Sequence, residues 1–223
     1  IEMVVALAYE AKVNYQDTFG MVMMWEVILA NDLMNRNIVV PPKKDNTKNK
    51  AYVGAYVKDV QTGMHKWVVS FDLNSLYPHL IMQYNVSPET ILTGITQQCG
   101  IDNLLDKKID LDKFYEKDIT IAASGQAFRK DVQGFLPRLM QEKYDNRVIF
   151  KKKMIEAKKK LEKETDPKKI DKLQKEADSY GNRQLAMKLM LNSVYGAFGN
   201  PYFRFYDLRI SEAITLGGQL SIR

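Results

Sequence analysis

The sequence predicts an α+β fold, in which an antiparallel sheet with helices precedes a long antiparallel pair of helices. Two observations predict the helical pair. Apolar residues recur at helical intervals over 135–164 and again from Lys168 to about Ala197, and Asp166-Pro167 interrupts this pattern with a helix stop and restart signal. Two strand-like runs earlier in the chain predict the sheet.

The N-terminal part is expected to be a helical connector over residues 1–43. Residues 1–14 and 19–35 both carry apolar side chains at helical intervals. Pro41-Pro42 and a polar, basic run through residue 50 then mark the expected domain boundary.

The two strand-like runs cover residues 52–57 and 66–71, with a turn signal at 61–63 between them. We expect them to form a hairpin whose second strand is buried and delivers Asp72 to its end. Pro78 then favours the first turn of a helix, which Leu80, Ile81 and Tyr84 continue.

Composition excludes several classes of protein. The chain is 45% hydrophobic and 10% aromatic, as in a globular protein. The single Cys99 excludes an internal disulfide framework, and two histidines argue against a zinc cluster. No apolar run reaches the length of about 18 residues that indicates a membrane span, and no secretory signal is present, so we expect a cytoplasmic protein without a membrane partner. The chain begins with Ile1, which suggests a segment of a larger protein.

The basic charge is concentrated in one segment. The net charge is +6, and residues 151–176 alone hold eleven lysines against six acidic residues. A polyanionic partner explains this surplus, and so does a long solvated helix pair with mixed charge. Both interpretations remain open at this point.

The residues around Asp72 suggest a site for a metal and a phosphate. An aspartate before a helix start can hold a divalent cation. The backbone N–H groups of Ser75, Leu76 and Tyr77 would at the same time face an anion.

Polar residues form stripes on the two long helices. Lys188, Asn192 and Tyr195 stand at i, i+4 and i+7, and Arg147 and Lys151 stand four apart. In antiparallel helices both stripes can face the same space, which would suit a triphosphate. Neighbouring positions that can pack inward are occupied by Leu185, Leu189 and Leu191. Each polar residue alone has an ordinary alternative: a helix cap, a core aromatic or a surface ion pair with Asp145.

Together these residues resemble family B DNA polymerases. Phe71-Asp-Leu-Asn-Ser-Leu-Tyr-Pro78 resembles their motif A, D-x-x-S-L-Y-P. Lys188-Leu-Met-Leu-Asn-Ser-Val-Tyr-Gly196 resembles motif B, K-x-x-x-N-S-x-Y-G, and Tyr52-Val-Gly-Ala55 resembles the short Y-x-G-G/A motif ahead of motif A. Residues 9–25, 87–90 and 199–209 resemble the replicative polymerases of T-even-type bacteriophages, which would place the chain in the cytoplasm of a phage-infected bacterium.

The resemblance implies a role for each motif residue. Asp72 and the Leu73 carbonyl would ligate catalytic Mg²⁺, of which the family uses two ions. The Tyr77 ring would lie under the deoxyribose and exclude a 2′-hydroxyl. The residues implied to bind the incoming dNTP are Ser75, Leu76, Tyr77, Arg147, Lys151, Lys188 and Asn192. Tyr195 and Gly196 would line the nascent base pair, and Gly54 would approach the template strand.

The resemblance also implies an architecture. Residues 44–136 would form the first part of the palm with motif A, 137–199 the fingers with motif B, and 200–223 the start of the returning palm segment. The family's second metal-binding motif, Y-G-D-T-D, is absent from the 223 residues. We therefore expect template-directed DNA synthesis only together with the remaining polymerase segments (exonuclease domain, second metal motif and thumb), with primer–template DNA and dNTP as partners. The alternative is a non-catalytic nucleic-acid-binding module derived from polymerase fingers.

Overall fold

The computed structural model describes residues 1–47 and 51–223, apart from the side chains of residues 113 and 115. Residues 48–50, the end of the predicted basic linker, lie outside the described residues. The chain divides into two compact units, which are described separately. The first consists of the described part of residues 1–49 with 139–206, and the second of the described part of 50–138 with 207–223.

The first unit is helical. It contains α1 (Glu2–Ala11), the short 3-10 helix η1 (Tyr15–Phe19), α2 (Met21–Asn35), most of α6 (Phe135–Leu161) and α7 (Pro167–Phe198). Helices α1 and α2 both pack against α7. The fully buried side chains at this junction come from α2 and α7 and include Met24, Trp25, Leu29, Met187, Met190 and Leu191.

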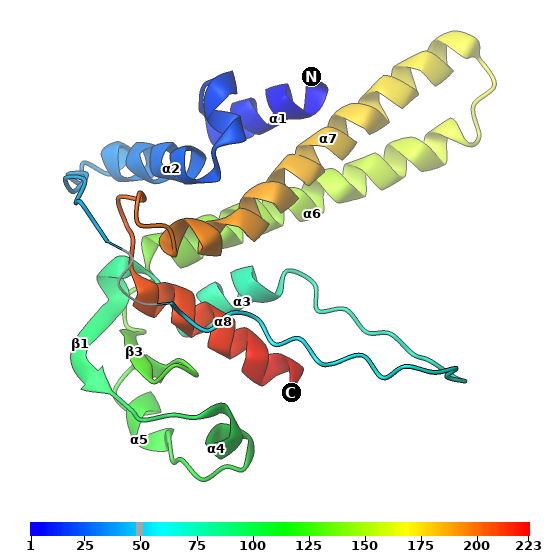
Figure 1. The fold of residues 1–223 in the computed structure, drawn as a ribbon. Coiled ribbons are helices and arrows are strands. Elements are labelled where there is room, and N and C mark those ends of the chain that lie inside the picture. The colour runs from blue at the N-terminus through cyan, green and yellow to red at the C-terminus, as the bar shows by residue number, and fades with distance from the viewer. Residues whose placement is uncertain (48–50) are drawn as a thin grey trace. The chain divides into compact units, whose positions relative to one another are not determined.

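Helices α6 and α7 form the predicted hairpin and run antiparallel (Figure 1). The break between them has the expected chemistry, because the Asp166 carboxylate accepts a 3.0 Å hydrogen bond from the Lys168 N–H and Pro167 is the first helical residue. Across the hairpin, the rings of Phe150 and Tyr180 stack with centroids 6.4 Å apart. Two long helices with a strong local stop signal were thus predicted correctly.

The second unit is mixed. Its helices are α3 (Leu76–Tyr84), the 3-10 turn η2 (Pro88–Thr90), α4 (Ile101–Leu105), α5 (Asp112–Tyr115) and α8 (Leu208–Ile222). Its antiparallel sheet has the strand order β1-β3-β2, from β1 (Ile91–Thr96), β2 (Ile119–Ile121) and β3 (Gln126–Arg129). Helix α8 packs against α3. The predicted α+β class is therefore correct, but the sheet is formed by other residues than the two predicted runs.

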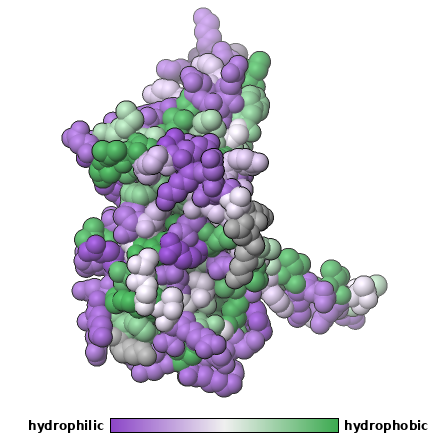
Figure 2. Space-filling model, turned by 60° about the vertical axis from the view of Figure 1, so that its left-hand side comes forward, coloured by the Kyte–Doolittle hydropathy of each residue, from purple (hydrophilic) through white to green (hydrophobic). Residues whose placement is uncertain are grey.

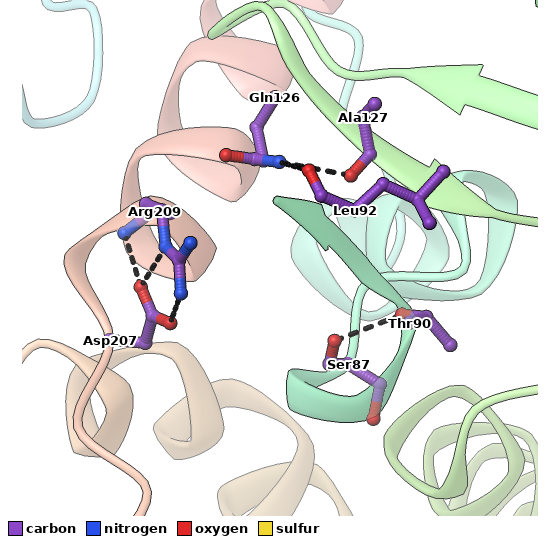
Figure 3. A network of polar contacts seen from close by, with 7 residues as sticks. All are labelled: Ser87, Thr90, Leu92, Gln126, Ala127, Asp207 and Arg209. Carbon is purple, nitrogen blue, oxygen red and sulfur yellow. Dashed lines mark hydrogen bonds and ion pairs between the residues drawn. The ribbon is translucent and has the colours of Figure 1, made fainter. Parts of the chain in front are cut away.

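Polar side chains make local hydrogen bonds that stabilise this unit (Figure 3). The Gln126 side-chain amide donates to the Leu92 carbonyl at 2.9 Å and to the Ala127 carbonyl at 3.0 Å, which ties β1 to β3. Asp207 caps α8 by accepting from the Arg209 N–H at 3.0 Å. Its carboxylate also hydrogen-bonds the Arg209 guanidinium, and this bond raises the pKa of Arg209 above its usual value.

The predicted strands before Asp72 are wrong. In the described part of the chain, residues 52–57 and 66–71 are not strands, and Val68, Val69 and Phe71 are 76%, 73% and 91% exposed. Figure 1 draws this segment as an extended trace, and Figure 2 shows apolar side chains uncovered along it. Alternation supplies a pattern for one strand, but a strand also needs a hydrogen-bonded neighbour, and the sheet in this unit draws its strands from residues 91–129.

Among the described residues, none of the helices combines the length and the apolar character required to cross a membrane.

Candidate functional site

Asp72 lies four residues before α3, in the extended segment, and its side chain is exposed. Ser75 precedes the helix in a left-handed conformation, with φ of 53° and ψ of 44°, so the chain turns sharply where the helix begins. The first helical hydrogen bond runs from the His79 N–H to the Ser75 carbonyl at 3.1 Å. Pro78 is buried in the first turn, as its fixed φ favours. The predicted helix start is confirmed.

Ser75, Leu76 and Tyr77 lie at the N-terminal end of α3, and all three are half-buried. The N-terminal end of a helix carries partial positive charge, which favours an anion. The exposed Asp72 carboxylate therefore precedes a turn of backbone that favours a phosphate. These two features belong to one short segment of the second unit.

Helix α8 holds the segment that contains Gly54. The Thr215 hydroxyl donates to the Val53 carbonyl at 2.7 Å, and the Gln219 side-chain amide donates to the Gly54 carbonyl at 2.6 Å. Sequence reasoning missed both residues. Their spacing of four on one amphipathic helix is a signal that could have indicated a shared polar face.

The motif B residues divide between two faces of α7. Lys188, Asn192 and Gly196 are exposed and Tyr195 is half-buried, whereas the neighbouring Met187, Leu191 and Val194 are buried. The prediction that Leu185 and Leu189 pack inward is wrong, because each is 37% exposed. Leu189 lies three residues before Asn192 and seven before Gly196, and Leu185 lies seven before Asn192. These spacings place both leucines on the same face as Asn192 and Gly196, while Leu191 faces the core.

Arg147 and Lys151 lie on α6, where Arg147 is half-buried and Lys151 is exposed. The contact between Phe150 and Arg183, with the guanidinium 4.0 Å from the ring centroid, fixes the register of the hairpin. Arg147 precedes Phe150 by three residues on α6, and Lys188 follows Arg183 by five residues on α7. Because the helices run antiparallel, both displacements point toward the same end of the hairpin. The two cationic stripes thus occupy neighbouring levels of the hairpin.

A basic hollow of about 460 Å³ lies at the turn of the hairpin. Four lysines line it together with Glu164, Leu173 and Glu176: Lys160, Lys163, Lys169 and Lys172. With four lysines against two glutamates, the lining is net basic, which is the charge that attracts a polyanion.

The implied metal ligands would supply part of a coordination shell. Asp72 and the Leu73 carbonyl offer oxygen donors, the kind that Mg²⁺ prefers. Within the described ranges, no group of three or more His, Cys, Asp or Glu residues is placed to hold a metal ion. The donor set fits magnesium in kind, with a single carboxylate.

The implied site residues fall on two units. The second unit carries Gly54, Asp72, Leu73 and residues 75–77, and the first carries Arg147, Lys151, Lys188, Asn192, Tyr195 and Gly196. That they form one joint site stays a prediction.

Comparison with known proteins identifies the family. The model of DNA polymerase family B matches residues 20–223, which is most of the chain. This chain belongs to family B of the DNA polymerases.

Individual relatives agree with this assignment. The chain is 30% identical to the DNA-directed DNA polymerase of Escherichia phage RB69, over 97% of this chain and 28% of that protein. It is 28% identical to the DNA-directed DNA polymerase of Enterobacteria phage T4, over 100% of this chain and 28% of that protein. The predicted resemblance to family B and to phage polymerases is confirmed, and the chain spans little more than a quarter of these relatives.

A solved structure shows the same fold. The family B DNA polymerase of Pyrobaculum calidifontis matches 99% of this chain with a TM-score of 0.66 and 21% identity, and the match covers 26% of that protein.

Proposed function

We propose that this chain binds the incoming dNTP and supplies one carboxylate of the metal site in a family B DNA polymerase that carries out template-directed DNA synthesis. The observation that carries the proposal is the division of motif B on α7. Lys188 and Asn192 are exposed, whereas two of the three residues between them that the motif leaves open, Met190 and Leu191, are buried. The third, Leu189, is 37% exposed and lies on the same side as the polar pair. Polar residues on the outer face are ordinary for a packed helix, so the match of these exposed residues to motif B is what favours a role in substrate binding.

The proposed architecture follows the resemblance. Residues 1–43 serve as the connector from the exonuclease side, 44–136 as the first part of the palm, 137–199 as the fingers and 200–223 as the start of the returning palm segment. The partners are primer–template DNA, dNTP and the remaining polymerase segments.

The chain's own residues act by binding and orienting the substrates. Arg147, Lys151 and Lys188 bind the triphosphate oxygens, and Asn192 supports that contact. The first turn of α3 binds phosphate through the N–H groups of residues 75–77. In the reaction the primer 3′-hydroxyl loses its proton and attacks the α-phosphate, the bond between the α- and β-phosphates breaks, and pyrophosphate leaves. Positioning and charge stabilisation are the main requirements of such a transfer, so a cationic helix face and a helix N-terminus suit it.

Asp72 and the Leu73 carbonyl are the proposed magnesium ligands. Magnesium held there would supply charge neutralisation for the reacting phosphates. Substrate phosphates and further polymerase segments complete the shell, because Mg²⁺ is usually bound by one or two carboxylates together with phosphates and water. Tyr77 excludes a 2′-hydroxyl, Tyr195 and Gly196 line the nascent base pair, and Gly54 approaches the template.

The test is the Lys188→Ala variant of the complete polymerase. Losing a charged hydrogen bond to the triphosphate raises the KM for every dNTP by about tenfold or more. The affinity for primer–template DNA stays unchanged. Lys158→Ala, an exposed lysine of α6 outside the stripes, is the matched control. An unchanged KM for dNTP in Lys188→Ala would contradict the proposed contact between Lys188 and the triphosphate.

The basic hollow at the hairpin turn favours one alternative, a non-catalytic nucleic-acid-binding module. In such a module, DNA binding depends steeply on salt, and each of Lys160, Lys163, Lys169 and Lys172 contributes about 0.9 to the slope of log affinity against log salt. Substituting Asp72 would then change nothing. Loss of synthesis on substituting Asp72 excludes this alternative.

A further inference from the structure

Tyr77 packs against the backbone of α8 at Gly218. A Cβ atom placed on Gly218 would lie 2.8 Å from Cε1 and 3.5 Å from Cδ1 of the Tyr77 ring. Carbon atoms in van der Waals contact are about 3.5–4.0 Å apart, so the ring occupies the space that any side chain at position 218 would fill. The position of the Tyr77 ring therefore requires glycine at 218.

The neighbouring glycine is under no such constraint. A Cβ atom on Gly217 would lie 3.5 Å from both methyl carbons of Leu80 and 3.6 Å from Cε2 of Tyr84, which is ordinary contact. Glycine within a helix is less favourable than alanine, so helix formation does not explain Gly218, which lies inside α8. Its contact with the ring gives a reason for the residue.

Neither helix is free to yield at this contact. Tyr77 is followed by the buried Pro78, and Leu80 and Ile81 of α3 are 3% and 0% exposed. On the other side, α8 is held by the hydrogen bonds of Thr215 and Gln219 to the carbonyls of Val53 and Gly54. A methyl group at 218 is thus expected to move the ring rather than a helix.

We propose that Gly218 is a positioning residue that seats the Tyr77 ring and thereby sets discrimination against the ribose 2′-hydroxyl. This inference rests on the proposed role of Tyr77 in sugar selection. Gly218 contributes no side chain to the substrate site. It leaves the space in which the ring is held between two packed helices, and substrate contact remains with Tyr77.

The experiment compares Gly218→Ala with Gly217→Ala in the complete polymerase, measuring kcat/KM for each dNTP and the matching rNTP. Because small misplacements of a positioning group have large kinetic effects, discrimination falls by about tenfold to a hundredfold in Gly218→Ala. Gly217→Ala keeps the original ratio. An unchanged ratio in Gly218→Ala, or an equal fall in both variants, would overturn the inference.

A double-mutant cycle separates this inference from the role of Tyr77 itself. In a Tyr77→Ala background, Gly218→Ala has no further effect on the ratio, because the ring is gone. A full additional effect there would show that Gly218 acts elsewhere. If Tyr77→Ala alone leaves the ratio unchanged, the proposed role of Tyr77 in sugar selection fails. If Tyr77→Ala changes it and Gly218→Ala does not, only the Gly218 inference fails.

Folding is checked in the same cycle. Should Gly218→Ala unfold the enzyme, Tyr77→Ala is expected to restore folding in the double variant, since the methyl group then meets no ring. Failure to restore folding would contradict the proposed contact.

Discussion

The indole N–H of Trp25 donates a 2.9 Å hydrogen bond to the hydroxyl of Ser193. Trp25 is fully buried on α2, and Ser193 is the serine of motif B on α7. The Ser193 hydroxyl in turn donates to the Met190 carbonyl at 2.9 Å. This serine therefore joins α2 to the motif B helix, close in sequence to Asn192 and Tyr195, for which we propose roles in substrate binding.

Replacing Ser193 by alanine is expected to lower the free energy of unfolding. The buried indole N–H loses its partner, and an unsatisfied buried donor costs about 1–3 kcal/mol. Chemical denaturation of the complete polymerase measures the change. The matched control is Ser179→Ala, because Ser179 is an exposed serine on the same helix. Equal stability of the two variants would contradict the structural role of Ser193.

An ion pair formed by Arg183 joins α1 to the hairpin. Its guanidinium pairs with Glu10 and lies 4.0 Å from the Phe150 ring centroid. The Glu10 side chain is 10% exposed and that of Arg183 is 35% exposed. Arg183→Ala leaves a largely buried carboxylate without this partner, which costs up to about 3 kcal/mol, the lower end for buried pairs, since the arginine is partly exposed.

The control for the Arg183–Glu10 ion pair is Lys175→Ala on the same helix. Lys175 pairs with Asp171, and the two side chains are 76% and 65% exposed. Breaking such an exposed pair costs about 0.5 kcal/mol or less. Thermal unfolding of both variants distinguishes the two cases. Equal losses of stability would contradict the stabilising role of the Arg183–Glu10 ion pair.

Tyr77→Ala is expected to increase incorporation of ribonucleotides relative to deoxyribonucleotides. Removing the ring removes the proposed barrier to a 2′-hydroxyl. The ratio of kcat/KM for rNTP to that for dNTP measures the effect in the complete polymerase. Tyr144→Ala, a half-buried tyrosine outside the proposed site, serves as the control. Unchanged sugar discrimination in Tyr77→Ala would contradict the proposal that the Tyr77 ring excludes a 2′-hydroxyl.

The 223 residues alone are not expected to extend a primed template. They hold one of the two carboxylate motifs that the resemblance implies, and the Y-G-D-T-D pattern is absent from the sequence. Primer extension in Mg²⁺ tests this, with the complete polymerase as the positive control. Measurable metal-dependent synthesis by the isolated chain would contradict the proposal that Asp72 needs a partner motif.

Local signals explain which parts of the fold were predictable. Asp166 and Pro167 mark the break between the long helices, because a capping carboxylate and a proline act through their own backbone neighbours. The start of α3 near Pro78 was predictable for the same reason. Motifs A and B were recognisable because their residues follow one another at fixed spacing.

Non-local partners explain what was not predictable. Residues 66–71 have a strand pattern, yet whether they pair depends on segments distant in sequence. The burial of Leu185 and Leu189 depends on where α1 and α2 pack, which their spacing does not reveal. The contact of Gly218 with Tyr77 joins residues far apart in the chain, and a glycine in a helix carries no pattern that points to its neighbour.

The most direct test of the proposed function is the single-turnover rate of nucleotide incorporation by Asp72→Asn in the complete polymerase. The control is Asp59→Asn, an exposed aspartate in the same extended segment. The amide keeps the shape and removes the charge, so the rate should fall by at least about a thousandfold while DNA affinity and folding are retained. Asp59→Asn should retain the original rate. A normal rate in Asp72→Asn would show that this carboxylate is not part of the metal site.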